Sequence, residues 1–315
     1  MTDLRQLRYF VAIVEHGSFS RAAEALHVAQ PALSLHVRNM EKDYGVALLF
    51  RSPRGVVPTE EGTILLRHAR TVLDQIAVAE EELRGHHADP AGEVRLGLPG
   101  TIGQILAVPL VRLVHQKHPK IRLRIAEAMS GYILDWMREG RIDLAVLYGE
   151  APEHGLVTEA LLKEPLQFFG TPEMLSRHQA PDSKTGITLT QVARMPLILP
   201  GEGHGLRDLL KRHSRAIGSD LNTVMDLDSY NNIKLLVAEG LGFSVLPQNA
   251  IAPEVADGQL EARDIVEPQI RRKVHLAHAA DRPMPNAVKV VREITRDMLH
   301  DLANTGQWTG AQPVK

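Results

Sequence analysis

Residues 18–45, SFSRAAEALHVAQPALSLHVRNMEKDYG, predict two short helices joined by a tight turn. Ser18 is a favoured N-cap residue, and apolar side chains recur behind it at helical spacing as far as Leu26. After the turn at residues 27–29, a second helix shows the same spacing. Two helices joined in this way predict a helix-turn-helix, whose second helix can enter the major groove of DNA. The buried side of that second helix is expected to consist of Leu33, Val37 and Met40.

The segments on either side complete a winged fold. An amphipathic helix precedes the pair, and Gly17 ends it where a glycine commonly follows a helix C-terminus. Residues 47–59, ALLFRSPRGVVPT, contain two short extended pieces around a turn at residues 53–55. We therefore expect a winged helix-turn-helix DNA-binding domain over residues 1–58.

A long helix follows the wing and carries an apolar seam. Thr59 is placed to cap it, and two glutamates in its first turn suit the positive end of the helix dipole. The apolar residues alternate spacings of four and three, which makes a heptad seam that an isolated helix cannot bury. The seam either docks on the protein's own body or pairs with the same helix of a second subunit, and we favour pairing. The predicted dimerisation seam is Leu65, Ala69, Val72, Ile76, Ala79 and Leu83.

Beyond residue 92 the pattern alternates between strand and helix. EVRLGLPG and KIRLRIAE predict strands, and SGYILDWMREG predicts a helix with Ser130 as its cap and Gly140 as its stop. Such alternation predicts an α/β domain with a mostly parallel sheet, here divided into two lobes. The expected segments are a linker helix over 59–87, a hinge over 88–92, an α/β domain over 93–303 (lobe I 93–165 and 266–303, lobe II 166–265) and a tail over 304–315.

Composition limits the functions open to the chain. Its 315 residues favour more than one domain, and no apolar run approaches the ~20 residues of a membrane helix. The N-terminus lacks the layout of a secretory signal, so we expect a cytoplasmic protein. The absence of cysteine excludes disulfides, thiolate nucleophiles and cysteine-based zinc fingers. A formal net charge of −2 means that any nucleic-acid binding has to be local.

Residues 10–62, FVAIVEHGSFSRAAEALHVAQPALSLHVRNMEKDYGVALLFRSPRGVVPTEEG, resemble the N-terminal module of LysR-type transcriptional regulators. The order of the domains is also similar, so the resemblance covers essentially the whole chain. Stretches such as RSPRGVVPTEEG, GRIDLAVLYG and LLKEPLQFFG further resemble the nitrogen assimilation control branch of that family. The resemblance implies a winged helix-turn-helix, a long linker helix and a two-lobed α/β effector domain like the periplasmic binding proteins.

The same resemblance implies a function and partners. It implies sequence-specific binding to double-stranded, dyad-symmetric operator DNA as a homodimer or homotetramer. It also implies that a small-molecule effector bound between the lobes alters transcription, and RNA polymerase is a further candidate partner. We expect no membrane partner, no cofactor, no bound metal and no enzymatic activity.

The side of the helix opposite its buried face is expected to meet the major groove. Gln30 can pair with adenine and Ser34 with either base edge, whereas Leu35 offers only apolar contact, as to a thymine methyl. Leu35 alternatively fills a gap against the wing or a neighbouring helix, and Arg38 alternatively is a solvated surface charge. Basic side chains and a helix N-terminus nearby suit phosphates, which position a protein without reading sequence. The predicted DNA contacts are Ser20, Arg21, Gln30, Pro31, Ser34, Leu35, Arg38, Arg51 and Arg54.

The loops that follow strands predict the effector site. In open α/β sheets, ligands settle beyond the carboxyl ends of strands, where helix amides accept anions. Such loops line the effector pocket in the resembled family, and the hydroxyls of Thr101 and Ser130 favour a small carboxylate or similar anion. Each residue is alternatively a cap or turn residue of structural use alone. The candidate effector-binding residues are Gly100, Thr101, Ser130, Gly131, Pro200 and Gly201, with Tyr148 and His204 as further candidates.

Two other protein classes share features with this chain. GLPGTIG at residues 97–103 follows a strand as a dinucleotide-binding loop does, but its glycines are spaced GxxGxxG instead of GxGxxG. His115, His118 and the pair at 86–87 suggest a metal site, yet no carboxylate with ligand spacing accompanies them. A nucleotide-binding oxidoreductase and a metal sensor are therefore the alternatives to a regulator.

Overall fold

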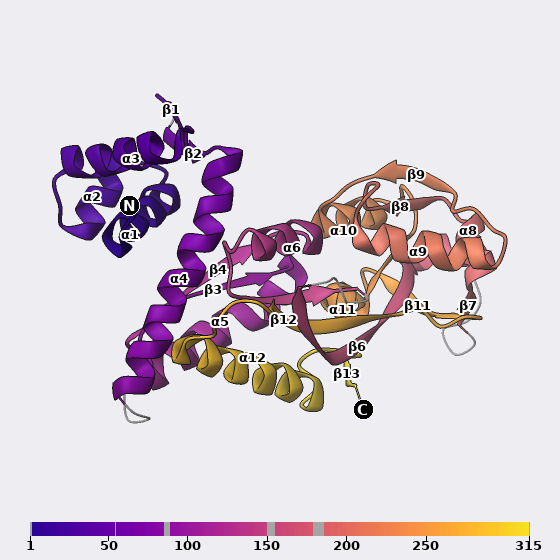
Figure 1. The fold of residues 1–315 in the computed structure, drawn as a ribbon. Coiled ribbons are helices and arrows are strands. Elements are labelled where there is room, and N and C mark those ends of the chain that lie inside the picture. Colours follow the sequence, from indigo (N-terminus) through magenta and orange to yellow (C-terminus); the bar gives the residue numbers. More distant parts are fainter. Residues whose placement is uncertain (1, 54, 85–88, 150–154, 179–185, 315) are drawn as a thin grey trace.

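The computed structural model describes residues 2–53, 55–84, 89–149, 155–178 and 186–314. It consists of a small N-terminal helical domain, one long helix and a larger α/β body (Figure 1). The long helix lies between the N-terminal domain and the α/β body, so each of them contacts one of its sides. Within the described residues, no helix is both long enough and apolar enough to cross a membrane.

The N-terminal domain is a winged helix-turn-helix, as predicted. Its elements are α1 (Leu4–His16), α2 (Phe19–Leu26), α3 (Gln30–Tyr44), β1 (Leu49–Ser52) and β2 (Gly55–Pro58). The helices pack around a core that includes Phe10, Ile13 and Leu33, all 0% exposed. The Ser18 hydroxyl caps α2 by accepting a hydrogen bond from the Arg21 amide at 3.4 Å. The capping residue and the apolar spacing therefore set the helix ends and the buried face that the sequence indicates.

A close approach of two backbone segments holds the wing. The amide of Val56 donates a hydrogen bond to the carbonyl oxygen of Gly17 at 2.9 Å. A Cβ atom on Gly55, whose φ is +131°, would lie 2.7 Å from that same oxygen. Because only glycine tolerates both the angle and the contact, this residue fixes the hairpin against the end of α1.

Helix α4 (Glu60–Arg84) follows directly after the wing. The Thr59 hydroxyl accepts a hydrogen bond from the Gly62 amide at 2.9 Å, which is the N-cap that the sequence predicts. The start of the helix packs tightly, since a Cβ atom on Gly62 would lie 2.0 Å from the carbonyl oxygen of Leu48. The N-terminal domain and α4 are therefore packed as one unit.

The apolar seam of α4 is divided between covered and uncovered residues. Ala69 is buried, and Leu65 packs against the core of the N-terminal domain. Val72 and Leu83, in contrast, are 41% and 88% exposed. The first part of the seam docks on the chain itself, and the second part presents apolar surface that this chain does not cover.

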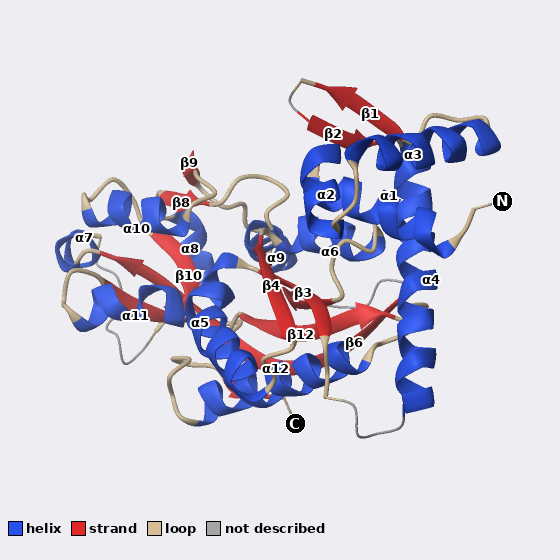
Figure 2. Cartoon of the chain, turned by 90° about the vertical axis from the view of Figure 1, so that its left-hand side faces the viewer, coloured by secondary structure: helices blue, strands red, loops and turns tan. Residues whose placement is uncertain are grey.

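The first lobe of the α/β body is a sheet with helices on both faces. Its elements are β3 (Gly92–Leu98), α5 (Gly100–Lys117), β4 (Ile121–Glu127), α6 (Ser130–Arg138), β5 (Leu144–Tyr148), β12 (Arg271–Ala279) and α12 (Asn286–Asn304). Helices α5 and α12 lie side by side over one face (Figure 2). Leu144 and Val146 of β5 point into that layer, while Ala145 and Leu147 pack with α6 on the opposite face.

The second lobe has a separate apolar core. Its elements are α7 (Pro172–Arg177), β7 (Ile187–Thr188), α8 (Leu189–Arg194), β8 (Leu197–Leu199), α9 (Gly205–Ala216), β9 (Thr223–Asp226), α10 (Tyr230–Ala238), β10 (Ser244–Pro247), α11 (Gln248–Ala256) and β11 (Glu261–Val266). The rings of Phe168 and Phe243 stack at its centre with 5.0 Å between their centroids.

One long strand, β6 (Leu156–Gly170), runs through both lobes. It pairs antiparallel with β12 in the first lobe and with β10 and β11 in the second. Along β6 the core contacts change from the first lobe at Leu162 to the second at Leu166. Where the chain returns to the first lobe, the core contacts change from the second lobe at Ile270 to the first lobe at Val274 in β12. The lobes are thus joined by two neighbouring strands.

The prediction of a mostly parallel sheet is wrong, because the sheet is mixed. Strand β3 pairs in parallel with β4 and β5, and β8 pairs in parallel with β9. The crossing strands β6 and β12 pair antiparallel with each other, and β12 pairs antiparallel with β5. Alternation of strand and helix in the sequence indicates local parallel units. It does not predict the antiparallel pairing of β6, because this strand enters the second lobe without an intervening helix.

The predicted tail folds onto the α/β body. Trp308 is 0% exposed within the core of the first lobe, and its indole Nε1 donates to Glu164 Oε2 at 2.7 Å. Beyond it, β13 (Gln312–Pro313) pairs with β6. The end of the chain is therefore part of the domain and contacts the strand that joins the lobes.

We predict that Trp308→Ala lowers the free energy of unfolding by about 3 to 5 kcal/mol, because it removes a fully buried aromatic side chain. Trp308→Phe keeps most of the packing and loses only the hydrogen bond to a buried carboxylate, so a smaller loss of about 1 to 3 kcal/mol is expected. Urea unfolding followed by circular dichroism measures both values. A loss below about 1 kcal/mol for the alanine variant would show that the tail is not part of the cooperative fold.

Candidate DNA interface and effector site

The outward face of α3 is available to DNA. Helix α3 and the hairpin β1–β2 form the upper edge of the N-terminal domain in both views, with α1 and α2 below them (Figures 1 and 2). Gln30, Pro31 and Arg38 are exposed, and Leu35 is 55% exposed. The structure therefore does not support the alternative in which Leu35 fills a gap within its own chain. Its side chain is an apolar group beside the polar side chains of Gln30, Ser34 and Arg38.

Side chains along this face already contact one another. Gln30 Nε2 donates to Ser34 Oγ at 3.0 Å, and Arg38 Nε lies 3.5 Å from the backbone oxygen of Ser34. The amide and the hydroxyl are both groups that can read base edges, and their mutual bond limits the rotamers they adopt before DNA arrives. This row follows one side of the helix at spacings of four residues.

The basic residues around the helix differ in how they are placed. Arg21 is exposed in the first turn of α2, beside the exposed Ser20. Arg51 in the wing pairs with Glu41 at 3.4 Å, and its guanidinium lies 4.9 Å from the ring centroid of Phe19. Arg51 therefore has intramolecular partners that phosphate has to replace. Arg54 lies outside the described residues.

In the α/β body, the predicted first-lobe residues converge on Tyr148. The hydroxyls of Thr101 and Tyr148 share a hydrogen bond at 2.9 Å. The Ser130 hydroxyl accepts a hydrogen bond from the Tyr148 amide at 3.2 Å. Ser130 is therefore not the cap of α6, as the sequence suggested. Met129 occupies the N-cap position, and the serine side chain binds the end of β5 instead.

The second lobe contributes His204 and the loop before it. Gly201 donates its amide hydrogen to the carboxylate of Asp228 at 3.0 Å, which holds that loop. His204 caps α9, since its Nδ1 accepts a hydrogen bond from the Leu206 amide at 3.2 Å. Its ring lies 5.7 Å from that of Tyr230, measured between centroids. Pro200 is buried behind the loop, whereas the predicted glycines Gly100 and Gly131 of the first lobe are exposed and offer only backbone groups.

Arg272 joins these two groups of residues, and the sequence prediction missed it. Its Cζ atom lies 3.3 Å from the ring centroid of Tyr148, and its Nε atom donates to Glu164. Tyr230 lies next to the same guanidinium, whose charge acts on the pKa of that tyrosine. Arg272 Nη2 is buried and makes no hydrogen bond of normal geometry to any described residue. The sequence held one sign that Arg272 is buried. It lies two residues before the apolar Val274, so both side chains point to the same face of the strand.

The environment fixes the protonation of the surrounding groups. Burial raises the pKa of Tyr148 well above 10.0, although the positive charge of Arg272 opposes that rise. Burial also raises the pKa of Tyr230. Burial, followed by the charge of Arg272, lowers the pKa of His204 below 6.5, so this ring is neutral at pH 7. The site therefore offers neutral phenol, hydroxyl and imidazole groups around one buried cation.

The alternatives have little support in the structure. Gly103 faces the Glu127 carboxylate so closely that a Cβ atom would lie 2.2 Å from Oε1. This glycine therefore permits α5 to pack on β4, which is a structural reason for its place in GLPGTIG. No group of three or more His, Cys, Asp or Glu residues able to hold a metal ion occurs in the described parts of the chain. His86 and His87 lie outside those parts.

Family models cover nearly the whole chain. The bacterial regulatory helix-turn-helix model of the LysR family matches residues 4–63, and the LysR substrate binding domain model matches residues 87–300. The chain is 35% identical to the nitrogen assimilation regulatory protein nac of Klebsiella aerogenes over 249 residues, which are 79% of each protein. It is 30% identical to the DNA-binding transcriptional dual regulator OxyR of Escherichia coli over 298 residues, 93% of this chain and 95% of OxyR.

A solved structure of a LysR-type regulator has the same fold. A full-length variant of OxyR from Pseudomonas aeruginosa superposes with a TM-score of 0.77 at 30% identity, over 94% of this chain and 95% of that one. The winged domain, the linker helix and the two-lobed body occur in one order, and the family models match both ends of that order. The chain therefore belongs to the LysR family of DNA-binding transcriptional regulators with an effector-binding domain.

Proposed function

We propose that this regulator binds dyad-symmetric DNA as a homo-oligomer and is controlled by a small, singly charged carboxylate or similar acceptor bound at Arg272 between the lobes. The observation that carries the effector proposal is the buried Nη2 atom of Arg272, which makes no hydrogen bond of normal geometry to a described residue although Tyr230 lies beside the guanidinium. A buried guanidinium nitrogen without a partner is costly, and an oxygen of a ligand would satisfy it.

The charges around Arg272 support the class of ligand. Glu164 is 1% exposed and already pairs with the guanidinium, so the two side chains together carry no net charge. His204 is neutral at pH 7, as its lowered pKa requires. A site of this kind offers one charged donor and several neutral hydroxyls, which suits one carboxylate better than a multiply charged anion. The hydroxyls of Thr101 and Tyr148 would then orient the rest of the molecule.

A thiol-based response is excluded by composition. The chain has no cysteine, so neither sulfenic acid nor a disulfide can form in it. Its similarity to proteins called hydrogen peroxide-inducible genes activators therefore does not extend to cysteine chemistry. Reversible binding of a ligand needs no cysteine, and it is the route that we propose for the α/β body.

Homo-oligomer formation has support in the exposed part of α4. Val72 and Leu83, from the predicted seam, are exposed, and Ile76 and Ala79 between them are half-buried. A partner helix of a second subunit would cover this apolar surface. Pairing of subunits would also place two α3 helices on two half-sites, which multiplies the specificity of DNA binding. A contact with RNA polymerase stays a prediction of the sequence.

Thr101→Val tests the effector proposal. The change keeps the shape of the side chain and removes the hydroxyl that meets Tyr148, so we expect about a tenfold loss of ligand affinity with unchanged DNA affinity. A thermal-shift screen of small monocarboxylates supplies the ligand, and isothermal titration measures its affinity. Thr305→Val, at an exposed position in the C-cap of α12, is the matched control and should bind the ligand as the parent does. Loss of DNA binding, or full ligand affinity in the Thr101 variant, would contradict the assignment.

Leu35→Arg tests the DNA face. A new cation on a face that meets DNA should strengthen binding to a duplex of arbitrary sequence and steepen the log–log salt dependence by roughly one unit. Fluorescence anisotropy at several salt concentrations measures both quantities. Leu235→Arg adds the same charge at a leucine that is 62% exposed in the second lobe, and it should leave the slope unchanged. Equal slopes for the two variants would show that Leu35 does not face the DNA.

A further inference from the structure

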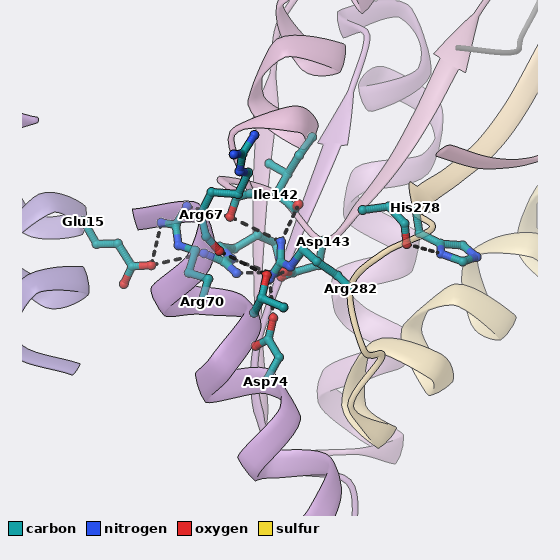
Figure 3. A network of polar contacts seen from close by, with 12 residues as sticks. Glu15, Arg67, Arg70, Asp74, Ile142, Asp143, His278 and Arg282 are labelled. Carbon is teal, nitrogen blue, oxygen red and sulfur yellow. Dashed lines mark hydrogen bonds and ion pairs between the residues drawn. The ribbon is translucent and has the colours of Figure 1, made fainter. Parts of the chain in front are cut away.

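A cluster of charged side chains lies where α1, α4 and the effector domain meet (Figure 3). We call it the interdomain cluster, and its members are Glu15, Arg70, Asp74, Arg95, Asp143 and Arg282. Arginines and acids are equal in number, so their formal charges balance. The cluster joins three parts of the chain that are far apart in the sequence.

Glu15 connects the DNA-binding domain to both of the other parts. It lies in the last turn of α1, and its Oε1 atom accepts from Arg70 Nη2 of α4 at 2.8 Å. The same oxygen accepts from Arg95 Nη1 of β3 at 3.1 Å. One carboxylate of the DNA-binding domain therefore binds a cation of the linker helix and a cation of the effector domain at once. Figure 3 shows Glu15 and Arg70 facing each other.

Helix α4 makes its own polar contacts to the effector domain. Arg70 Nη1 donates to the carbonyl oxygen of Gly140, just after α6, at 2.6 Å. Asp74 accepts from Arg282, whose guanidinium also reaches Asp143 Oδ1 at 3.2 Å. Further along α4, the Asn286 amide at the start of α12 donates to Glu81 at 2.8 Å. The contacts thus follow α4 along its length.

Polar contacts dominate this interface. None of the buried apolar clusters among the described residues contains residues from both sides of it. The cluster is nevertheless shielded from water, because the side chains of Arg70, Arg95 and Asp143 are only 6%, 11% and 8% exposed. A cavity of about 20 Å³ beside Asp74 and Arg282 has room for about one water molecule. Ion pairs shielded in this way are weakly screened by salt and strongly directional.

We propose that Glu15 and Asp74 are positioning residues for DNA binding, which hold the unit of the DNA-binding domain and α4 at a fixed angle to the effector domain. That angle sets where α3 lies in each subunit and hence which separation of DNA half-sites a pair of subunits accepts. Because no buried apolar cluster of the described residues spans this interface, ion pairs and hydrogen bonds, and not a shared apolar core, hold the angle. The proposal rests on DNA binding by the family and is independent of any effector.

Replacement of the two acids by amides is a clean test. In Glu15→Gln, Arg70 keeps the Gly140 carbonyl and Arg95 keeps Asp143, so both cations retain a partner. Asp74→Asn removes the second acid on the same side, and Arg282 keeps Asp143. The matched control is the double variant of Glu82→Gln and Asp220→Asn, which neutralises two exposed acids outside the cluster. Thermal unfolding of each variant establishes that both domains are folded.

Distances within one chain can be measured directly because the protein has no cysteine. Spin labels on Lys42→Cys in α3 and Gln104→Cys in α5, both exposed positions, report the angle between the domains. Labelled chains are diluted into an excess of unlabelled ones, so that only distances within a chain are read by double electron–electron resonance. We expect one narrow distribution for the parent and the control, and a broad one for the Glu15→Gln, Asp74→Asn double variant.

DNA binding provides the second measurement. If the two acids only stabilised the fold, their replacement would not change which half-site spacing the protein prefers. Duplexes are first selected from a random pool with the parent protein, and the two half-sites are then separated by spacers of increasing length. The parent should prefer one spacing, and the double variant should lose that preference by about fivefold or more while it binds a single half-site as before. An unchanged distance distribution, or an unchanged spacing preference, overturns the proposal. If the double variant does not fold, Glu15→Gln alone takes its place with the same expected results.

Discussion

Arg272 and Glu164 form an ion pair inside the effector domain, directly opposite each other on β12 and β6. On both strands this pair lies between the last residue of one lobe's core and the first of the other's. A buried pair of this kind adds little net stability, but removal of one partner leaves an uncompensated charge and is costly. The pair therefore helps to set the register of the two crossing strands and holds the tail through the hydrogen bond of Trp308 to Glu164. It also lies at the place where we propose that a ligand binds.

The molecule has two polar centres with different tasks. At Arg272, polar side chains of both lobes lie around one buried guanidinium, and we propose that a ligand bound there changes how the lobes meet. At Glu15, the interdomain cluster is fully charge-balanced and connects the effector domain to the helix that carries the DNA-binding domain. Gly140, between α6 and β5, accepts from both Arg70 and Arg282. Strand β5 then ends at Tyr148, so one short segment of the first lobe contacts both centres.

Local signals predicted the fold of the DNA-binding domain well, and they predicted the contacts of the candidate effector residues only in part. Ser18, Thr59 and the apolar spacing define helices through contacts within a few residues, which a sequence displays directly. The hydroxyl of Ser130 also suggested a helix cap. It instead accepts a hydrogen bond from the amide of Tyr148, eighteen residues later. Arg272 and Glu164 meet only because β6 and β12 are neighbours, and nothing in strand–helix alternation predicts that pairing. The mixed sheet could not be predicted for the same reason, because its antiparallel pairs join strands that are far apart in the sequence.

On the proposed function, a ligand at Arg272 and DNA at α3 act on one equilibrium of the regulator. Isothermal titration of a small carboxylate, into the protein alone and into the protein saturated with its selected duplex, measures this coupling. Linkage requires that DNA changes ligand affinity by the same factor by which the ligand changes DNA affinity, and we expect a factor of about five or more. Ligand affinities that are identical with and without DNA would contradict it.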